Sequence, residues 1–231
     1  MINVFIVSLS DSERRDKIVS QLDDVKISNY HFFDAFDARQ MSESELSFLF
    51  DKDKFYSLYN RYPSKGEIGC TLSHLRLIEY ISNHGIDEAI ILEDDAIITK
   101  KFIKFYQDSH VDVNGVVILG YSKVSWLRSF YHYFKRRLIA NIKKYNSYSI
   151  GCINKQFTCG TVGYYINLKN IRGNIDRVLD IKPGHLADDW SFYADFMPVM
   201  HIRPFAVFEN YKKMKSSIEE ERCIKVMDSK K

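Results

Sequence analysis

An apolar segment that runs straight into three carboxylates constrains this chain more than any other feature of its sequence. Residues 89–92 read Ala-Ile-Ile-Leu, a short run typical of a strand buried on both faces of a sheet. Glu93, Asp94 and Asp95 follow at once. Because open α/β sheets bind ligands at the carboxyl ends of their strands, we expect these side chains to border a crevice.

The spacing of the carboxylates suggests a cation. Glu93 and Asp95 are two residues apart, so both would point the same way if the backbone stays extended. Mg²⁺ and Mn²⁺ prefer hard oxygen ligands and commonly share them with the phosphates of a substrate. The sequence therefore predicts a divalent-cation site, and the alternative is a solvated acidic turn.

Strand-like and helix-like segments alternate along the chain, which favours an α/β fold. Apolar runs with strand character occupy residues 4–9, 30–33, 88–92, 116–119, 160–166 and 198–207, and helical patterns occupy residues 41–60 and 72–84. With 231 residues and few Gly or Pro, we expect one domain over residues 1–211. Within it, residues 122–148 form a basic insertion, and residues 212–231 form a charged C-terminal tail.

The composition, with 45% apolar and 27% charged residues, excludes a disordered or fibrous chain. The four cysteines lack the spacing of a zinc site, which favours reduced thiols in a cytosolic protein. The first residues lack the basic region of a signal peptide, and no stretch reaches the roughly 20 apolar residues of a spanning helix. We therefore expect a cytoplasmic protein.

A second group of polar residues lies in the segment from Glu67 to His74. Gly66 and Gly69 are expected to form a turn that leads into a helix, whose free N–H groups would suit a phosphate or a sugar edge. Ser73 and His74 would then lie one turn into that helix. The alternative for His74 is a packing or capping role.

Asp188 and Asp189 stand just before Trp190 and open a predicted short helix. An inverting sugar transfer needs a carboxylate that takes the proton from the attacking hydroxyl, and an aromatic ring beside it could stack on a sugar. Either aspartate could be that base, with a slight preference for Asp189. The alternative is a pair of helix-capping residues beside a core tryptophan.

Three of these segments combine in a specific pattern. They are Phe5-Ile6-Val7-Ser8-Leu9 with Arg14 nearby, Glu67-Ile68-Gly69-Cys70-Thr71-Leu72-Ser73-His74, and Ile91-Leu92-Glu93-Asp94-Asp95-Ala96. Together they resemble glycosyltransferase family 25, which includes bacterial lipooligosaccharide galactosyltransferases and collagen galactosyltransferases. The resemblance extends over about residues 2–210.

The resemblance implies a GT-A-type fold, with a Rossmann-like mixed sheet flanked by helices, and an enzyme that transfers a hexose. The donor would be a UDP-sugar, most simply UDP-galactose, and Mn²⁺ or Mg²⁺ would assist an inverting transfer that forms a β linkage. Asp95 would bind the metal directly, and Glu93 would contact the ribose or the metal shell. Asp189 or Asp188 would be the catalytic base. The donor-binding residues would be Ser8, Leu9, Arg14, Ser73, His74, Glu93 and Asp94.

The insertion at residues 122–148 carries a charge of +7, although the whole chain carries only +3. Its apolar residues recur every four positions, which predicts a basic amphipathic helix suited to an anionic membrane surface. These residues are Trp126, Phe130, Phe134, Leu138 and Ile142. We expect peripheral binding at the cytoplasmic face of a bacterial inner membrane, with a lipooligosaccharide or another lipid-linked glycan as acceptor. The alternative is a helix packed on the core with a solvated basic face.

Three other functions compete with this interpretation. Nucleic-acid binding is disfavoured because the rest of the chain is acidic and no such motif is present. A metal-dependent phosphohydrolase could use the same carboxylates. A sugar-binding or peripheral membrane module would need Glu93, Asp94 and Asp95 only for structure.

Overall fold

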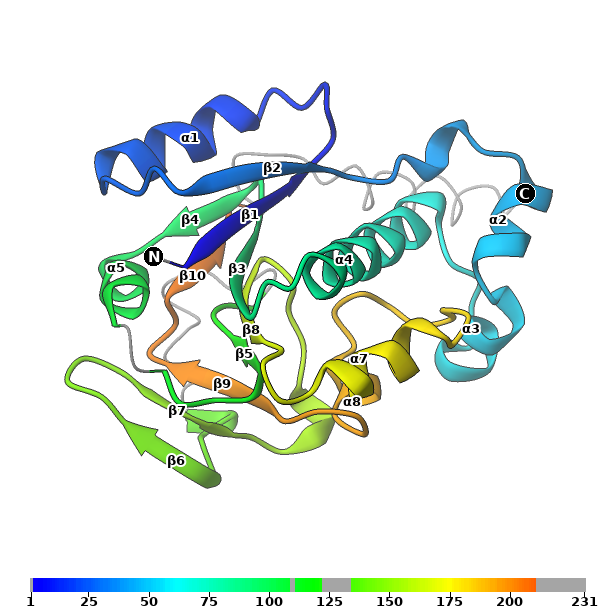
Figure 1. Ribbon diagram of the computed structural model, residues 1–231. Coiled ribbons are helices and arrows are strands. Elements are labelled where there is room, and N and C mark those ends of the chain that lie inside the picture. The colour runs from blue at the N-terminus through cyan, green and yellow to red at the C-terminus, as the bar shows by residue number, and fades with distance from the viewer. Residues whose placement is uncertain (1, 109–110, 122–133, 211–231) are drawn as a thin grey trace.

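The computed structural model describes residues 2–108, 111–121 and 134–210, and its centre is an eight-stranded mixed sheet (Figure 1). The strand order is β2-β1-β3-β8-β5-β9-β7-β6. These strands are β1 (Asn3–Ser8), β2 (Tyr30–Asp34), β3 (Glu88–Glu93), β5 (Gly115–Ile118), β6 (Ala140–Lys144), β7 (Ser149–Cys152), β8 (Gly163–Asn167) and β9 (Val199–Arg203). The predicted α/β class, a mixed sheet flanked by helices, is confirmed.

Helices cover both faces of this sheet (Figure 1). They are α1 (Arg15–Asp24), α2 (Glu43–Leu49), α3 (Lys52–Tyr59), α4 (Lys65–Asn83), α5 (Lys100–Gln107), α7 (Arg172–Leu179) and α8 (Trp190–Tyr193), with 3₁₀ turns at Ala38–Gln40 and Lys155–Phe157. The predicted helical stretch at residues 41–60 is therefore two helices, because Phe50 and Asp51 adopt extended backbone angles between them.

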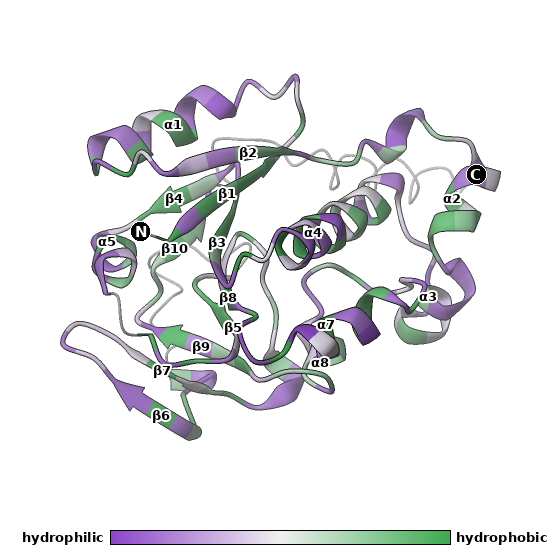
Figure 2. Ribbon diagram, viewed as in Figure 1, coloured by the Kyte–Doolittle hydropathy of each residue, from purple (hydrophilic) through white to green (hydrophobic). Residues whose placement is uncertain are grey.

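The pleat of β3 distributes its apolar residues between two cores. Ile90 and Leu92 pack with α1 and α5 on one face, whereas Ala89 and Ile91 pack with α4, α7 and α8 on the other. All four side chains are fully buried, as the uninterrupted apolar run predicted. In Figure 2 the central strands are accordingly mostly hydrophobic.

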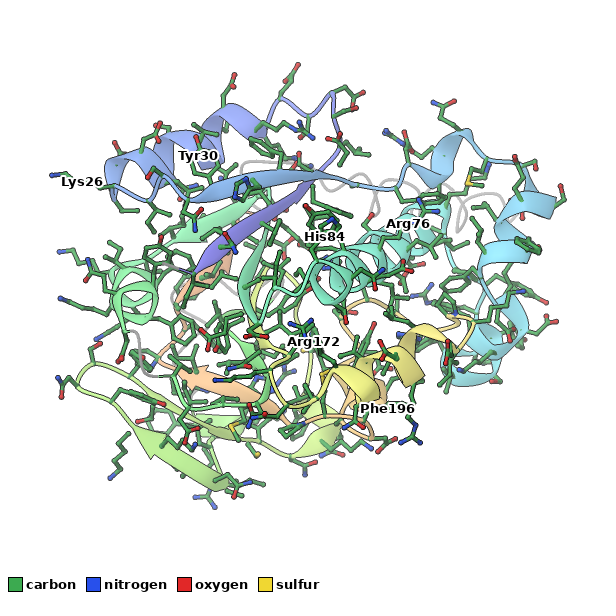
Figure 3. The ribbon with its side chains drawn as sticks, in the orientation of Figure 1. Lys26, Tyr30, Arg76, His84, Arg172 and Phe196 are labelled. Atoms are coloured by element: carbon green, nitrogen blue, oxygen red, sulfur yellow. The ribbon has the colours of Figure 1, made fainter. Side chains whose placement is uncertain are left out.

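Two further features fix the helices around the sheet. Arg172 of α7 donates to the carbonyl of Ser82 in the last turn of α4 (2.9 Å) and to Asp87 (2.8 Å), which ties the two helices together (Figure 3). A smaller apolar cluster joins α2 and α3 to the first half of α4. Its buried members are Ala38, Leu46, Phe50, Phe55, Ile68 and Leu72.

A two-stranded sheet lies beside the end of β3. Its strands are β4 (Ala96–Ile98) and β10 (Val207–Glu209), which pair antiparallel with Glu209 opposite Ala96. The segment 198–207, which was predicted to have strand character, contains β9 and the start of β10. These two strands belong to different sheets, so β10 brings the end of the described chain beside the acidic segment.

In the described part of this segment, Phe134 and Lys135 are helical as predicted, but the helix does not continue along the segment. Ala140–Lys144 is strand β6, and it forms an antiparallel hairpin with β7 that contains a register shift between Ala140 and Lys143. A spacing of four residues fits a strand as well as a helix, because every second strand residue lies on the same face. Residues 122–133 of the insertion and the predicted tail at 212–231 lie outside the described residues.

Within the described ranges, none of the helices has both the length and the apolar character that a membrane crossing requires.

Candidate active site

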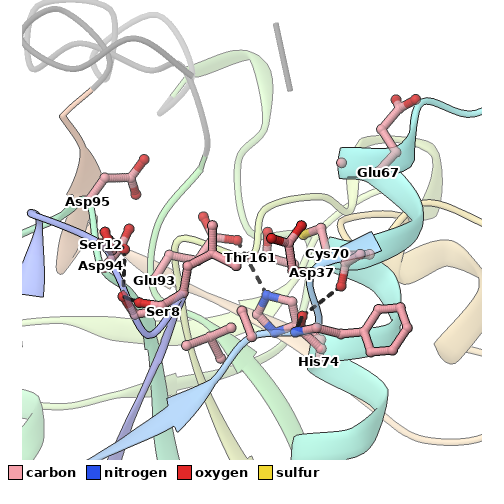
Figure 4. A pocket seen from close by; sticks show the side chains of 18 of the residues that line it. Ser8, Ser12, Asp37, Glu67, Cys70, His74, Glu93, Asp94, Asp95 and Thr161 are labelled. Atoms are coloured by element: carbon pink, nitrogen blue, oxygen red, sulfur yellow. Dashed lines mark hydrogen bonds and ion pairs between the residues drawn. The ribbon is translucent and has the colours of Figure 1, made fainter. Parts of the chain in front are cut away.

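A pocket of about 630 Å³ opens at the carboxyl ends of β1 and β3. Its walls are the end of β1 and the following turn, the first half of α4, the turn after β3, and residues 35–39 and 186–188. Figure 4 shows its acidic side, where Glu93 lies beside His74, Asp94 lies beside Ser8 and Ser12, and Asp95 lies apart from Glu93. The predicted crevice at the strand ends is therefore present, and the predicted cluster borders it.

Asp94 is held by the end of β1. Its Oδ2 accepts hydrogen bonds from the hydroxyls of Ser8 and Ser12, both at 2.7 Å, and Arg14 Nη1 lies 3.4 Å from its Oδ1. The parallel register explains this meeting, because Val7 pairs with Glu93 and so brings Ser8 beside Asp94. The carboxylate of Asp94 thus fastens the β1 turn to the end of β3.

Glu93 turns the other way, toward α4 (Figure 4). His74 Nε2 lies 3.3 Å from Glu93 Oε1, and His74 Nδ1 lies 3.0 Å from the hydroxyl of Tyr164 in β8. Burial opposes ionisation of Glu93, but hydrogen bonds from His74 and Thr161 and the charge of His74 outweigh it and lower the pKa of Glu93. Glu93 is accordingly a carboxylate at neutral pH.

Asp95 lies in a turn, so the expected extended geometry of residues 93–95 is wrong. Asp94 and Asp95 link β3 to β4, and the turn separates the side chains of Glu93 and Asp95 (Figure 4). Burial, followed by the charges of Glu93, Glu209 and Asp94, raises the pKa of Asp95 to about 8. Arg14 Nη1 lies 3.7 Å from Asp95 Oδ2, whereas Oδ1 is buried and has no hydrogen-bond partner among the described residues.

These observations fit a divalent cation beside Asp95. A buried carboxylate oxygen without a hydrogen-bond partner destabilises the folded protein, and the negative charge of neighbouring carboxylates destabilises it further. A cation would offset both effects, and its oxygen ligands could come from Asp95 together with Glu93 or Glu209. Arg14 lies against this group, with its Nη1 3.4 Å from Asp94 Oδ1 and 3.7 Å from Asp95 Oδ2, which is longer than a close ion pair with either aspartate.

The start of α4 differs from the expected glycine turn. The helix begins at Lys65, its N-cap is Ser64, and the Glu67 side chain accepts from the Ser64 amide in a capping box. Arg61 also donates two hydrogen bonds to Glu67, at 2.9 and 2.6 Å. The amides of Ser64 and Glu67 are therefore satisfied within the protein, and Gly66 and Gly69 lie inside the helix.

Gly69 serves packing instead. A Cβ at this position would lie 2.7 Å from the carbonyl oxygen of Phe36, so only glycine lets this part of the pocket wall approach α4 so closely. One turn further on, the hydroxyl of Ser73 donates to the Gly69 carbonyl (2.6 Å) and accepts from the Phe36 amide (2.8 Å). Ser73 borders the pocket, but its hydroxyl is engaged in holding residues 36–38.

The two aspartates before α8 have different surroundings. Asp189 caps α8, with its Oδ1 bonded to the amide and hydroxyl of Ser191, and its Oδ2 accepts a 2.6 Å hydrogen bond from the hydroxyl of Tyr59. Asp188 lines the pocket, and Asp189 is absent from its lining. The capping alternative thus describes Asp189, and Asp188 is the carboxylate that faces the space for a ligand.

Several pocket residues were not predicted. Ser12 follows β1 by four residues, Thr161 precedes β8, and Glu209 reaches the site only because β10 pairs with β4. Ser12 could have been identified from the sequence, because a serine in the turn after the first strand of an α/β sheet lies near the crevice at the strand ends. The sequence around Glu209 could not indicate that it belongs to the site, because its position depends on a strand pairing across more than 100 residues.

Comparison with known proteins decides the family. The family model described as glycosyltransferase family 25 (LPS biosynthesis protein) matches residues 1–191. This chain belongs to glycosyltransferase family 25. The predicted family is confirmed, and the matched region contains every residue that we assigned to the site from the sequence.

The relatives of this family 25 chain are distant. A Drosophila melanogaster protein named glycosyltransferase 25 family member is 25% identical over 206 residues, which cover 87% of this chain and 31% of that protein. A Bos taurus protein named "Probable inactive glycosyltransferase 25 family member 3" is 30% identical over 104 residues, covering 43% and 17%. The chain thus spans less than a third of the length of either relative.

Among solved structures, a glycosyltransferase involved in the glycosylation of the major capsid of PBCV-1 superposes with a TM-score of 0.43 and 9% identity. The alignment covers 97% of this chain and 99% of that one.

The contact at Gly69 yields a test of the pocket wall. Gly69→Ala should lower the free energy of unfolding by about 1–3 kcal/mol, because the added methyl group collides with the Phe36 carbonyl. Gly173→Ala is the matched control, because Gly173 also lies in a helix and a Cβ there meets nothing within 4 Å. The control should gain up to about 1 kcal/mol from helix propensity. Urea denaturation measures both, and equal stability of the two variants would contradict the packing role.

Proposed function

We propose that this protein is a cation-assisted glycosyltransferase that moves a hexose from a UDP-sugar to a glycan acceptor. The observation that carries the proposal is the buried carboxylate group of Asp95, placed with Glu93, Asp94 and Glu209 at the edge of a 630 Å³ pocket with Asp188 in its lining. A pocket of this volume is within the range of sites for drug-sized ligands. Galactose as the sugar and a lipooligosaccharide as the acceptor rest on the family resemblance.

The cation, Mn²⁺ or Mg²⁺, would be held by Asp95 with help from Glu93 or Glu209, and when bound it would offset the negative charge of the departing diphosphate. Asp94 acts indirectly, because its hydrogen bonds to Ser8 and Ser12 fix the turn after β1. Leu9 and Arg14 border the pocket on that turn, where the nucleotide would bind. Ser73 would shape this wall through Phe36, and His74 would orient Glu93.

For the base we favour Asp188 over Asp189. The acceptor hydroxyl oxygen would attack the anomeric carbon from the side opposite the nucleotide, and Asp188 would take its proton. The bond between that carbon and the diphosphate oxygen would break, and UDP would leave with the electron pair. Asp189 would support Asp188 by capping α8 and by its bond to Tyr59.

Calorimetric titration with UDP tests the donor site without an acceptor. We expect UDP to bind the wild-type protein in the presence of Mn²⁺ and to bind at least about tenfold more weakly with EDTA, because the cation joins the carboxylates to the diphosphate. Asp95→Asn should bind equally weakly in both conditions. Asp195→Asn, which changes an exposed carboxylate paired with Lys155, is the control. Metal-independent binding of UDP, or tighter binding of GDP, would contradict the proposed donor site.

Slow hydrolysis of UDP-galactose tests the base, because water can replace the acceptor. Asp188→Asn should release UDP at least about 100-fold more slowly than the wild type, while its calorimetric affinity for UDP stays unchanged. The same Asp195→Asn variant should hydrolyse the donor at the wild-type rate. Hydrolysis by Asp188→Asn at the wild-type rate would remove Asp188 from the mechanism.

We also propose that the β6–β7 hairpin contacts an anionic membrane, at the cytoplasmic face if the acceptor is lipid-linked. Ile139 and Ile142 are 58% and 48% exposed, and the exposed cations Arg137 and Lys144 accompany them. Apolar side chains beside cations suit the interface of an anionic bilayer. Arg136 is unsuited to this role, because its guanidinium packs over Tyr121 and donates to the sulfur of Cys159.

Flotation with vesicles that contain phosphatidylserine tests the hairpin. Arg137→Glu combined with Lys144→Glu should reduce the floating fraction severalfold, because it reverses the charge beside the exposed isoleucines. Lys17→Glu combined with Lys104→Glu makes the same change in net charge on α1 and α5 and should float like the wild type. Equal flotation of both double variants would contradict the hairpin as the membrane contact.

A further inference from the structure

We infer that Cys70, His74 and Glu93 form a second cation site, which takes a zinc-type transition metal. One ligand atom from each of these residues, the Cys70 sulfur, a His74 ring nitrogen and a Glu93 carboxylate oxygen, can be chosen so that all lie within 4.8 Å of one another. The site adjoins the proposed donor site and shares Glu93 with it. Its chemistry is different, and its existence does not depend on transferase activity.

The fold places these three ligands without distortion. Cys70 and His74 are four residues apart in α4, so they lie on the same face of the helix, and both border the pocket. Glu93 is the last residue of β3, which packs against α4 through Ile91 in the same apolar core. A helix face and a strand end thus meet around one point, as ligands from separate elements do in many metal sites.

His74 is oriented for a ligand. Its ring is buried, and the hydroxyl of Tyr164 lies 3.0 Å from Nδ1, which leaves Nε2 directed at Glu93. Metal-binding histidines usually have their second ring nitrogen fixed by such a partner. Nε2 and the Glu93 oxygen are 3.3 Å apart, a separation at which either a shared proton or a bound cation can satisfy both atoms.

The ligand types select the metal. A thiolate, an imidazole and a carboxylate suit Zn²⁺ or Co²⁺, whereas Mg²⁺ and Mn²⁺ prefer oxygen ligands only. Three protein ligands leave a fourth position, which water or a ligand could fill. Burial, followed by the charge of Glu93, raises the pKa of the Cys70 thiol, so Cys70 is poorly suited to act as a nucleophile.

Occupation of this site would have a consequence for the proposed donor site. A zinc ion bound to Glu93 would remove that carboxylate from the group around Asp95. The two cations would therefore compete, and zinc would weaken the binding of UDP with Mn²⁺. This consequence rests on the proposed function, whereas the zinc site itself can be tested with the metal alone.

Titration of the purified protein with Co²⁺ tests the site directly. We expect one equivalent of Co²⁺ to produce a thiolate-to-cobalt charge-transfer band in the near ultraviolet, together with strong visible bands typical of four-coordinate cobalt. Zn²⁺ should abolish both by displacement, and an equal concentration of Mg²⁺ should not. Absence of the charge-transfer band in excess Co²⁺ would overturn the proposal.

Variants of the proposed ligands show which residues produce the charge-transfer band. Cys70→Ser should lose it, and Cys159→Ser should keep it, although Cys159 also lines the pocket. Tyr164→Phe should bind Co²⁺ about tenfold more weakly, because it removes the hydroxyl that fixes His74. His74→Gln provides an independent test if Cys70→Ser does not fold, and circular dichroism checks folding in each case. A band that survives in folded Cys70→Ser or in His74→Gln would also overturn the site, and neither result bears on the binding of UDP.

Discussion

The parallel pairing of β1 with β3 is the constraint on which the candidate active site depends. Its register sets Val7 against Glu93, so the two strand ends finish side by side and Ser8 can reach Asp94. A shift of one residue would turn Ile90 and Leu92 away from the core they share with α1 and α5. The apolar packing of the sheet and the position of the carboxylates are therefore fixed by the same pairing.

The charge of the site follows from that arrangement. The turn after β3 and the end of β10 bring Asp94, Asp95 and Glu209 near one another, and Arg14 Nη1 lies 3.4 Å from Asp94 Oδ1 and 3.7 Å from Asp95 Oδ2. Asp94 is satisfied by two hydroxyls, and Glu93 by His74 and Thr161. For Asp95, burial and the neighbouring carboxylates oppose ionisation more strongly than Arg14 supports it. In the proposed function, a cation supplied with the nucleotide provides that support, so donor binding and metal binding would be coupled.

Much of this arrangement could be predicted from local sequence. The uninterrupted run before Glu93 identified a strand buried on both faces, and its carboxyl end correctly located the pocket. The backbone at Asp94 and Asp95 could not be predicted in the same way, because a turn and an extended segment share the same residue types.

Other features depend on contacts between residues far apart in the sequence. The glycines before Ser73 were predicted to form a turn, but Gly69 is instead required for close packing against Phe36, which is distant in sequence. The hairpin at β6 was mistaken for a helix because spacing by four satisfies both periods. Glu209 was missed because its position depends entirely on tertiary pairing.

Crystallography of the protein with UDP and Mn²⁺, using the anomalous signal of manganese, tests the central claim most directly. The account predicts an anomalous peak within bonding distance of a carboxylate oxygen of Asp95 and of the UDP diphosphate. The uracil should lie near the turn after β1, and the diphosphate should lie on the acidic side of the pocket. UDP bound in this pocket with no manganese at Asp95, or manganese and UDP bound elsewhere on the protein, would contradict the account.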